Sequence, residues 1–460
     1  MSLTLKTHLW RNLLHHQFDV SKIRGQGYDG ASNMRGEWNR LQALVLNDCP
    51  YAYYVHCFAH KLQLTLVAAS REIIPVSQFF SHLASIINVV CASSKRHDDL
   101  QRAKAKEIEN LLELGEIKSG KGLNQVGTLR RAGDTRWGSH FYSICSLINM
   151  YDAARVILKS IIIDAHATGP HRADADAAYT QMQLFEFVFI LHLLKEVMGK
   201  TDVLSKALQK KSQDILNAME LVSATKESLN SFRNNGWDSF ITEHQVEMPD
   251  MSAPYTSTRY QPRRKDGHVT FEHFYRVDLF TSTLDKQLHE LNSRFNEHVI
   301  ELFSLSASLV PKDHPNGINV EQIGLLVEKY YPEDFTEQER IDLRCQLDIF
   351  NIDMKENPRL SGATTVASLC KILVDTRKRQ TYYLIDRVIR LILTLPVSTA
   401  TIERGFSAMK IFKNRLRNKM SDEFLANNLV IYIERDIADT FDSSSVIDEF
   451  KELKGRRAEL

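Results

Sequence analysis

Strand-forming segments are confined to the first 60 residues, and this confinement limits the fold of the chain more than any other feature. Residues 22–28 form a short strand candidate that ends at Asp29, and residues 51–58 are rich in β-forming side chains. Helical periodicity precedes, separates and follows these two segments, which is typical of an α/β unit. From about residue 76 to residue 391 the helical periodicity continues with almost no strand candidates. We therefore expect α/β plus all-α architecture in a mainly helical chain.

The long helical part carries one sustained apolar stripe. Its side chains recur at three- and four-residue spacing, which places them on one helix face. They are Val277, Phe280, Leu284, Leu288, Leu291, Phe295, Val299 and Leu302. Near the C-terminus, a further helix from about residue 421 places Leu425, Leu429, Tyr432 and Ile433 on one face. An apolar face so close to the chain end needs a partner, either its own domain or another subunit. The changes in pattern predict parts at residues 1–75, 76–391 and 392–460.

Charge and composition exclude several classes of protein. The chain has 58 Lys and Arg against 57 Asp and Glu, so any nucleic-acid contact must come from local patches. Its six cysteines are widely scattered with no CxxC pair, which favours a reducing compartment over a secreted disulfide framework. The most apolar stretch, residues 184–194, is too short to span a bilayer. We expect a soluble intracellular protein without a membrane partner.

Two acidic residues attract attention as candidate metal ligands. Asp29 follows a predicted strand, and open α/β sheets place ligands outside the carboxyl ends of their strands. A carboxylate there could hold Mg²⁺, although a turn aspartate that caps the following helix explains it equally simply. Glu403 lies one turn into a predicted helix and shares a polar face that could line a site. The alternative is a glutamate stabilised by the positive end of the helix dipole.

Three further signals have both a functional and a structural interpretation. The run at residues 404–419 has six basic residues and no acid, so it is either a phosphate-contacting patch or a solvated helix face. Arg136 and Trp137 could stack on an unpaired base or form a packed cation–π pair. Cys57 and His60 have the spacing of half a zinc site, with no second ligand pair nearby.

Four of these segments together resemble hAT-superfamily DNA transposases, in particular the host-retained branch related to MYM-type and TTF-type zinc-finger proteins. The segments are residues 28–34 (YDGASNM), 56–64 (HCFAHKLQL), 134–137 (DTRW) and 395–433 (LPVSTATIERGFSAMKIFKNRLRNKMSDEFLANNLVIYI). They occur in the order and spacing of the family, and the last is long and highly specific.

The resemblance implies a partial RNase H-like domain over residues 1–75, interrupted by a large all-helical insertion. A last RNase H-like helix and a C-terminal dimerisation region would follow from residue 392. In the family, three acids bind two divalent metal ions for phosphodiester attack. Asp29 would match the second acid and Glu403 the third. Trp137 would match an aromatic residue that stabilises a flipped base, and Cys57 and His60 match a motif beside the active site.

The first acid of the family belongs on a strand upstream of the initial helix, and no residue before Asp29 lies on such a strand. The N-terminal zinc finger that binds transposon ends is also missing from the sequence. We therefore expect an incomplete acid triad, a protein that is not an enzyme, and no cofactor unless the acidic site is functional and takes Mg²⁺.

These features predict a truncated or domesticated hAT transposase-like protein of the nucleus that retains protein dimerisation, with weak DNA association and no small-molecule substrate. The predicted DNA contacts are Arg136, Trp137, Arg404, Lys413, Arg415 and Arg417, and the predicted homodimer contacts are Leu425, Leu429, Tyr432 and Ile433. One alternative is a fragment of an active, metal-dependent transposase. Another is a helical scaffold without a nucleic-acid role.

Overall fold

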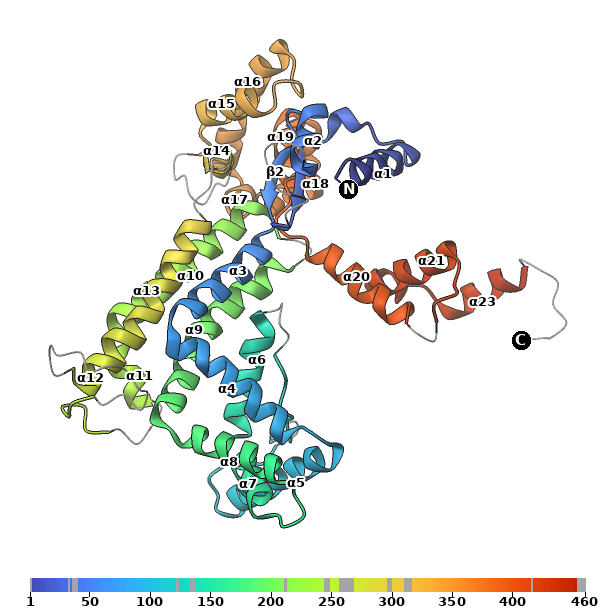
Figure 1. The fold of residues 1–460 in the computed structure, drawn as a ribbon. Helices are drawn as coiled ribbons and strands as arrows, with labels where there is room; N and C mark the ends of the chain where they lie inside the picture. Colours follow the sequence, from blue (N-terminus) through green and yellow to red (C-terminus); the bar gives the residue numbers. More distant parts are fainter. Residues whose placement is uncertain are drawn as a thin grey trace.

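The structure is a computed structural model, and the prediction of a mainly helical chain is confirmed. It describes residues 2–31, 34, 40–120, 124–132, 137–210, 213–243, 249–255, 269–295, 300–309, 317–414 and 417–452. Figure 1 shows three regions around a small α/β unit: a long helical body, an upper helical lobe, and a C-terminal arm that projects sideways.

The α/β unit contains two short parallel strands, β1 (Gly25–Tyr28) and β2 (Tyr53–His56), which pair in register from Gly25 with Tyr53 to Tyr28 with His56. Parallel strands need a crossover connection, and helix α2 (Leu41–Asp48) supplies it. Helix α1 (Ser2–His15) packs on α2, where Trp10 Nε1 and Lys6 Nζ both donate to the Asp48 carboxylate at 2.8 and 2.7 Å. Both strands therefore lie within the segments that the sequence predicted.

The helical body begins directly after β2 and holds most of the apolar core (Figure 1). Its helices are α3 (Phe58–Glu72), α4 (Ile74–Val90), α5 (Ser94–Glu113), α6 (Trp137–Asn149), α7 (Tyr151–Ile163), α8 (Gly169–Gln183), α9 (Phe185–Leu208), α10 (Ile215–Asn235), α11 (Trp237–Glu243), α12 (Phe271–His273) and α13 (Ser282–Arg294). Helix α9 is buried on several faces because it lies between its neighbours, and Phe187, Phe189 and Leu193 are almost fully enclosed.

The predicted apolar stripe is largely buried, since Phe280, Leu284, Leu291 and Leu302 are at most 1% exposed. Val277 is the exception, with 44% exposure. It lies in a segment of wider turns with i→i+5 hydrogen bonds, Phe274–Thr281, which rotates side chains away from the positions of a regular helix. Val299 lies outside the described residues.

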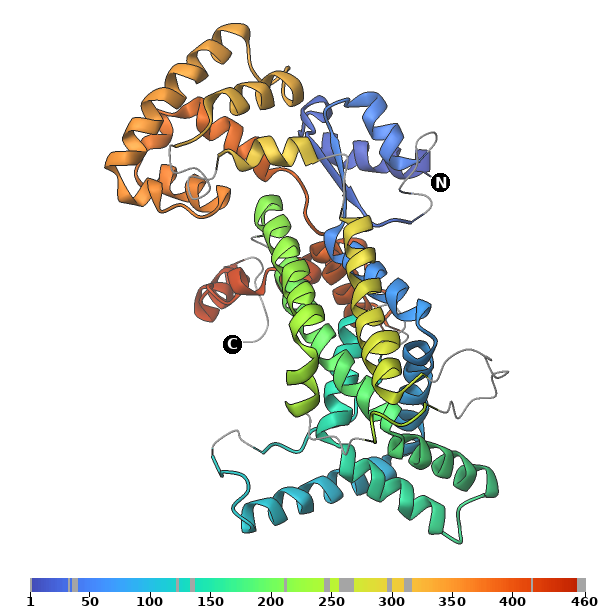
Figure 2. The ribbon, with the colours of Figure 1, turned by 90° about the vertical axis from the view of Figure 1, so that its left-hand side faces the viewer.

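The upper lobe contains α14 (Ile300–Ala307), α15 (Val320–Tyr330), α16 (Glu337–Glu356), α17 (Pro358–Ser361), α18 (Val366–Asp375) and α19 (Tyr383–Leu393). Thr336 and Glu339 form a capping box that fixes the start of α16. Figure 2 shows this lobe beside the α/β unit, above the helical body.

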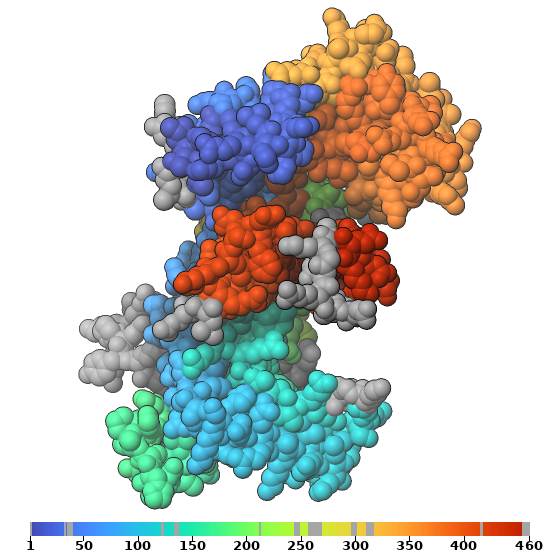
Figure 3. Space-filling model, turned by 90° about the vertical axis from the view of Figure 1, so that its right-hand side faces the viewer, coloured from blue at the N-terminus to red at the C-terminus, as the bar shows by residue number. Residues whose placement is uncertain are grey.

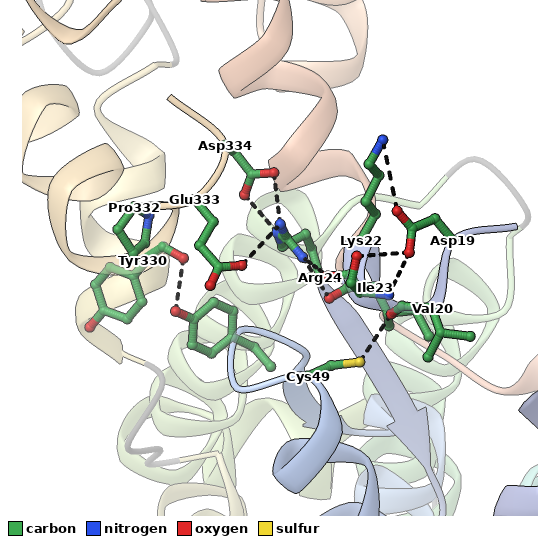
Figure 4. Close-up of polar contacts among 12 residues, drawn as sticks. Asp19, Val20, Lys22, Ile23, Arg24, Cys49, Tyr330, Pro332, Glu333 and Asp334 are labelled. Carbon is green, nitrogen blue, oxygen red and sulfur yellow. Dashed lines mark hydrogen bonds and ion pairs between the residues drawn. The ribbon is translucent and has the colours of Figure 1, made fainter. Parts of the chain in front are cut away.

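A buried ion pair joins the α/β unit to the upper lobe (Figure 4). Arg24 donates through Nε and Nη2 to the two carboxylate oxygens of Asp334, at 2.6 and 3.0 Å, and its side chain is only 6% exposed. Tyr53 Oη also donates to the Tyr330 carbonyl oxygen at 2.8 Å. These contacts hold the amino ends of both strands against the segment that follows α15.

The arm contains α20 (Ala400–Phe412), α21 (Asp422–Ile433), α22 (Arg435–Ala438) and α23 (Ser443–Glu452). Helices α20 and α21 pack on each other, with Ile433 Cδ1 3.8 Å from where a Cβ on Gly405 would lie. Figure 1 shows that most of the arm stands away from the rest of the molecule, and Figure 3 views the molecule from the side of the arm.

Across the described residues, no single helix is long and apolar enough to cross a membrane, and α3 with α4 reaches that threshold only as a pair bent by 105°.

Candidate functional site

Sequence motifs that lie far apart along the chain meet in space at the carboxyl ends of β1 and β2. Cys57 N donates to the Tyr28 carbonyl oxygen at 3.0 Å, which ties the ends of the two strands together. Phe58 N donates to the Val397 carbonyl oxygen at 2.9 Å, although more than 300 residues separate them. The segment at residues 395–399 therefore lies against the strands.

Two glycines in β1 make this close approach feasible. A Cβ on Gly27 would lie 2.8 Å from Pro396 Cβ and Cγ, and one on Gly25 would lie 2.9 Å from the Thr394 carbonyl oxygen. Both distances are shorter than side-chain contacts tolerate, so the strand surface needs residues without a Cβ here.

Cys57 connects the strand ends to the start of α20. Its Sγ lies 3.2 Å from both the backbone N and the Oγ1 of Thr399, and Thr399 Oγ1 lies 3.3 Å from Glu403 Oε1. Thr399 has one hydroxyl proton, so it donates to either the Cys57 sulfur or the Glu403 carboxylate at a given moment. The structure thus brings the segments that carry Asp29, Cys57 and Glu403 to one end of the sheet.

A row of rings lies beside Asp29. Tyr28 stacks with Tyr54 at 6.1 Å between ring centroids, Tyr54 with His56 at 6.5 Å, and His56 approaches His60 at 5.7 Å. Burial raises the pKa of the Tyr28 phenol to about 12, so this phenol stays protonated at neutral pH.

Among the described residues of this junction, the acids are not gathered into a two-metal site. Asp29 Oδ1 accepts a hydrogen bond from Ala31 N at 3.3 Å, as an aspartate in a turn does, and Glu403 lies on an exposed face. Within the described ranges, no group of three or more His, Cys, Asp and Glu side chains could hold a metal ion. Cys57 Sγ accepts hydrogen bonds from Thr399, and its pairing with His60 as zinc ligands stays a prediction. The described part of the junction therefore lacks the set of three acids that the resemblance implies for the metal centre.

The predicted DNA contacts fall into three groups. Arg136 and Arg415 lie outside the described residues, and Trp137 begins α6 with a side chain that the structure does not describe. Arg404 donates to the Gln209 carbonyl oxygen at the end of α9, so it anchors the arm to the body. Lys413 and Arg417 are exposed after α20.

Some of the predicted dimer contacts pack between α20 and α21 of the same chain. Leu425 is buried, Leu429 and Ile433 are half-buried, and Tyr432 meets Phe412 edge to face at 5.5 Å while 48% exposed. Their role between two chains stays a prediction.

Sequence reasoning missed a larger apolar surface on the same arm. Large apolar side chains that are 44–66% exposed occur on every helix of α20–α23, and they are Ile402, Phe406, Ile411, Phe424, Val430, Ile431, Tyr432, Ile437, Phe441, Val446, Ile447 and Phe450. We call them the arm surface. The sequence of α21 could have indicated this surface. Its apolar side chains lie all around the helix instead of forming one stripe, so packing against α20 cannot cover all of them.

Two family models match the ends of the chain. One described as "ZMYM1/FAM200, RNase-like domain" matches residues 1–40, and one described as "hAT family C-terminal dimerisation region" matches residues 353–437. Residues 353–437 are thus similar to the dimerisation region of the hAT family. The second match covers α17 to α21 and includes most of the arm, and the first covers α1 and β1.

Curated relatives resemble this chain along most of its length. The mouse protein "52 kDa repressor of the inhibitor of the protein kinase" is 22% identical over 458 residues, which cover 96% of this chain and 57% of the relative. The human protein of the same name is 22% identical over 460 residues, covering 96% of this chain and 56% of the relative. The chain therefore spans little more than half the length of these relatives.

Proposed function

We propose that this chain is a domesticated hAT transposase-like protein that acts in the nucleus by associating with itself through the arm surface, and that it does not cleave DNA. The observation that carries the proposal is the arm surface, whose large apolar side chains are 44–66% exposed along α20–α23. Exposed apolar side chains that gather in one region mark interaction sites on soluble proteins. The match to a dimerisation region over most of the arm supports a second copy of the chain as the partner.

The same proposal treats the α/β unit as a partial RNase H-like domain kept for its structure. The turn geometry of Asp29 and the bond of Cys57 to Thr399 support this, because these groups hold chain segments together. The printed name of the curated relatives describes regulators, which fits a protein that acts by association.

A weak DNA contact through the exposed Lys413 and Arg417 completes the proposal. Contacts of this kind bind phosphates without reading sequence, and they weaken steeply as salt rises. Retention on duplex DNA that does not change between low and high salt would contradict this part.

The self-association is tested by the mass of the protein in solution. Ile431 is 62% exposed, so Ile431→Asp leaves the packing within the chain intact while placing a charge in the arm surface. We expect the wild-type chain to have the mass of a dimer in size-exclusion chromatography with light scattering, and the variant to have that of a monomer.

The matched control is Ile349→Asp on α16, an isoleucine with 58% exposure outside the arm. It should remain dimeric. Leu429→Asp is a poorer test, because that side chain is half-buried and its loss would disturb the arm itself. A wild-type chain that stays monomeric at all concentrations would contradict the proposal, and so would a dimeric Ile431→Asp.

A further inference from the structure

A groove of about 400 Å³ lies along α19, and none of its lining residues belongs to the arm surface. Three arginines line it, Arg379 just before the helix and Arg387 and Arg390 on it. Tyr383 and Leu391 line the same groove, and the Tyr383 ring is 46% exposed. The groove thus combines concentrated positive charge with an accessible aromatic face.

A buried carboxylate holds two of the arginines in place. Asp386, whose side chain is 5% exposed, accepts from Arg379 Nε at 3.1 Å and from Arg390 Nε at 2.6 Å. Both bonds use only Nε, and among the described residues the Nη groups of these two arginines have no protein acceptor. Each guanidinium therefore keeps its forked end for an acceptor outside the chain.

The third arginine, Arg387, is held by residues outside α19. Arg387 Nη1 donates to Glu339 Oε1 at 2.9 Å and to the Asp334 carbonyl oxygen at 3.0 Å, and its guanidinium lies 5.2 Å from the Phe335 ring centroid. The three arginines outnumber the two carboxylates of Asp386 and Glu339, so the groove has an excess of positive charge. Their guanidinium groups are already held in place, so binding an anion does not require them to reorganise.

We propose that the α19 groove binds single-stranded nucleic acid, with phosphates on Arg379 and Arg390 and a base stacked on Tyr383. A positive groove with an exposed aromatic ring is the combination that single strands use, since phosphates bind the guanidiniums and any base can stack. An acidic peptide would use the arginines but would gain nothing from the Tyr383 ring. The groove is separate from the arm surface, and from the basic residues that follow α20.

The binding is tested on the full chain with a fluorescein-labelled single-stranded deoxyoligonucleotide of mixed sequence, followed by anisotropy over a range of NaCl concentrations. Arg379→Gln removes one phosphate contact while Arg390 still compensates the charge of Asp386. It should lower the slope of log affinity against log salt by about 0.7. Tyr383→Leu removes only the ring and should weaken binding about fivefold or more at unchanged slope.

Arg172→Gln on α8 is the matched control, because it removes one exposed positive charge at the opposite end of the molecule (Figure 1). It should change neither affinity nor slope. Equal effects of Arg379→Gln and Arg172→Gln would overturn the proposal, as would displacement of the oligonucleotide by poly-glutamate as effectively as by an unlabelled strand. Loss of binding in Arg417→Gln alone would place the contact after α20 and also overturn the groove, whereas the proposed dimer is judged separately by mass.

Discussion

The Arg24 side chain joins two parts of the molecule through one guanidinium. Burial lowers its pKa, but the bidentate bonds to Asp334 outweigh that effect, so the pKa is raised overall and the group stays charged. Its Nη1 also donates to the Ser21 carbonyl oxygen at 2.8 Å, which shapes the entry into β1. Figure 4 shows Arg24 between the loop at residues 19–23 and the segment that ends at Asp334.

Arg24→Met should destabilise the fold by about 3 kcal/mol, because it leaves the Asp334 carboxylate, 18% exposed, without its partner. Urea unfolding followed by circular dichroism measures this loss. Lys22→Met is the control, since Lys22 is 79% exposed and should change stability by about 0.5 kcal/mol or less. Replacing both partners, as Arg24→Met with Asp334→Leu, should recover part of the loss. A loss as small as that of Lys22→Met would show that the pair is not structural.

At the scale of elements, the junction depends on a strand surface without side chains. Pro396 lies against Gly25 and Gly27, and Cys57 and Phe58 bond the residues that follow it. The strand, the start of α3 and the start of α20 are thus one packing unit.

Gly27→Ala should cost about 1–3 kcal/mol, because the added methyl group overlaps Pro396. Thermal unfolding measures the change, and Gly27→Ala with Pro396→Ala should recover most of it. Gly324→Ala on α15 is the matched control: its Cβ would meet nothing within 4 Å, and alanine favours a helix interior, so stability should rise by up to about 1 kcal/mol. If Gly27→Ala were as harmless as the control, the close packing of the junction would be refuted.

Local pattern predicted the elements, whereas the contacts between them needed the structure. Both strands lie within residues 22–28 and 51–58, because β-forming side chains signal a strand within a few positions. The pairing of Arg24 with Asp334 spans 310 residues, and no local pattern encodes such a contact. The face that contains Leu425 was predicted as apolar, but periodicity does not tell whether α20 or a second chain covers it.

At the scale of the whole molecule, the apolar core is distributed unevenly. One continuous cluster runs from Val55 to Val397 through the helical body and the upper lobe, and a small second cluster around Val45 joins α1 to α2. Among the described residues of the arm, only Ala400, Ala408 and Leu425 are buried apolar side chains. The arm therefore has little core of its own.

Backbone amides of α21 should exchange with solvent at least about 100-fold faster than those of α9 when the protein is dilute, because few buried contacts hold the arm. If the arm surface pairs two chains, raising the protein concentration should slow exchange in α21 and leave α9 unchanged. Hydrogen–deuterium exchange with mass spectrometry measures both, and Ile431→Asp should remove the concentration dependence. Equal protection of α9 and α21 in dilute protein would contradict the uneven core.

The bond between Cys57 and Thr399 also has a consequence during synthesis of the chain. Its partners are 342 residues apart, so at ordinary translation rates β2 waits about 20–70 s for the segment that secures it. Helix pairs that are close in sequence, such as α7 with α8 and α9 with α10, have no comparable delay, whereas α3 also waits for α13. The strands are among the first elements made and among the last to be enclosed, which makes them the part of the nascent chain most in need of protection from aggregation.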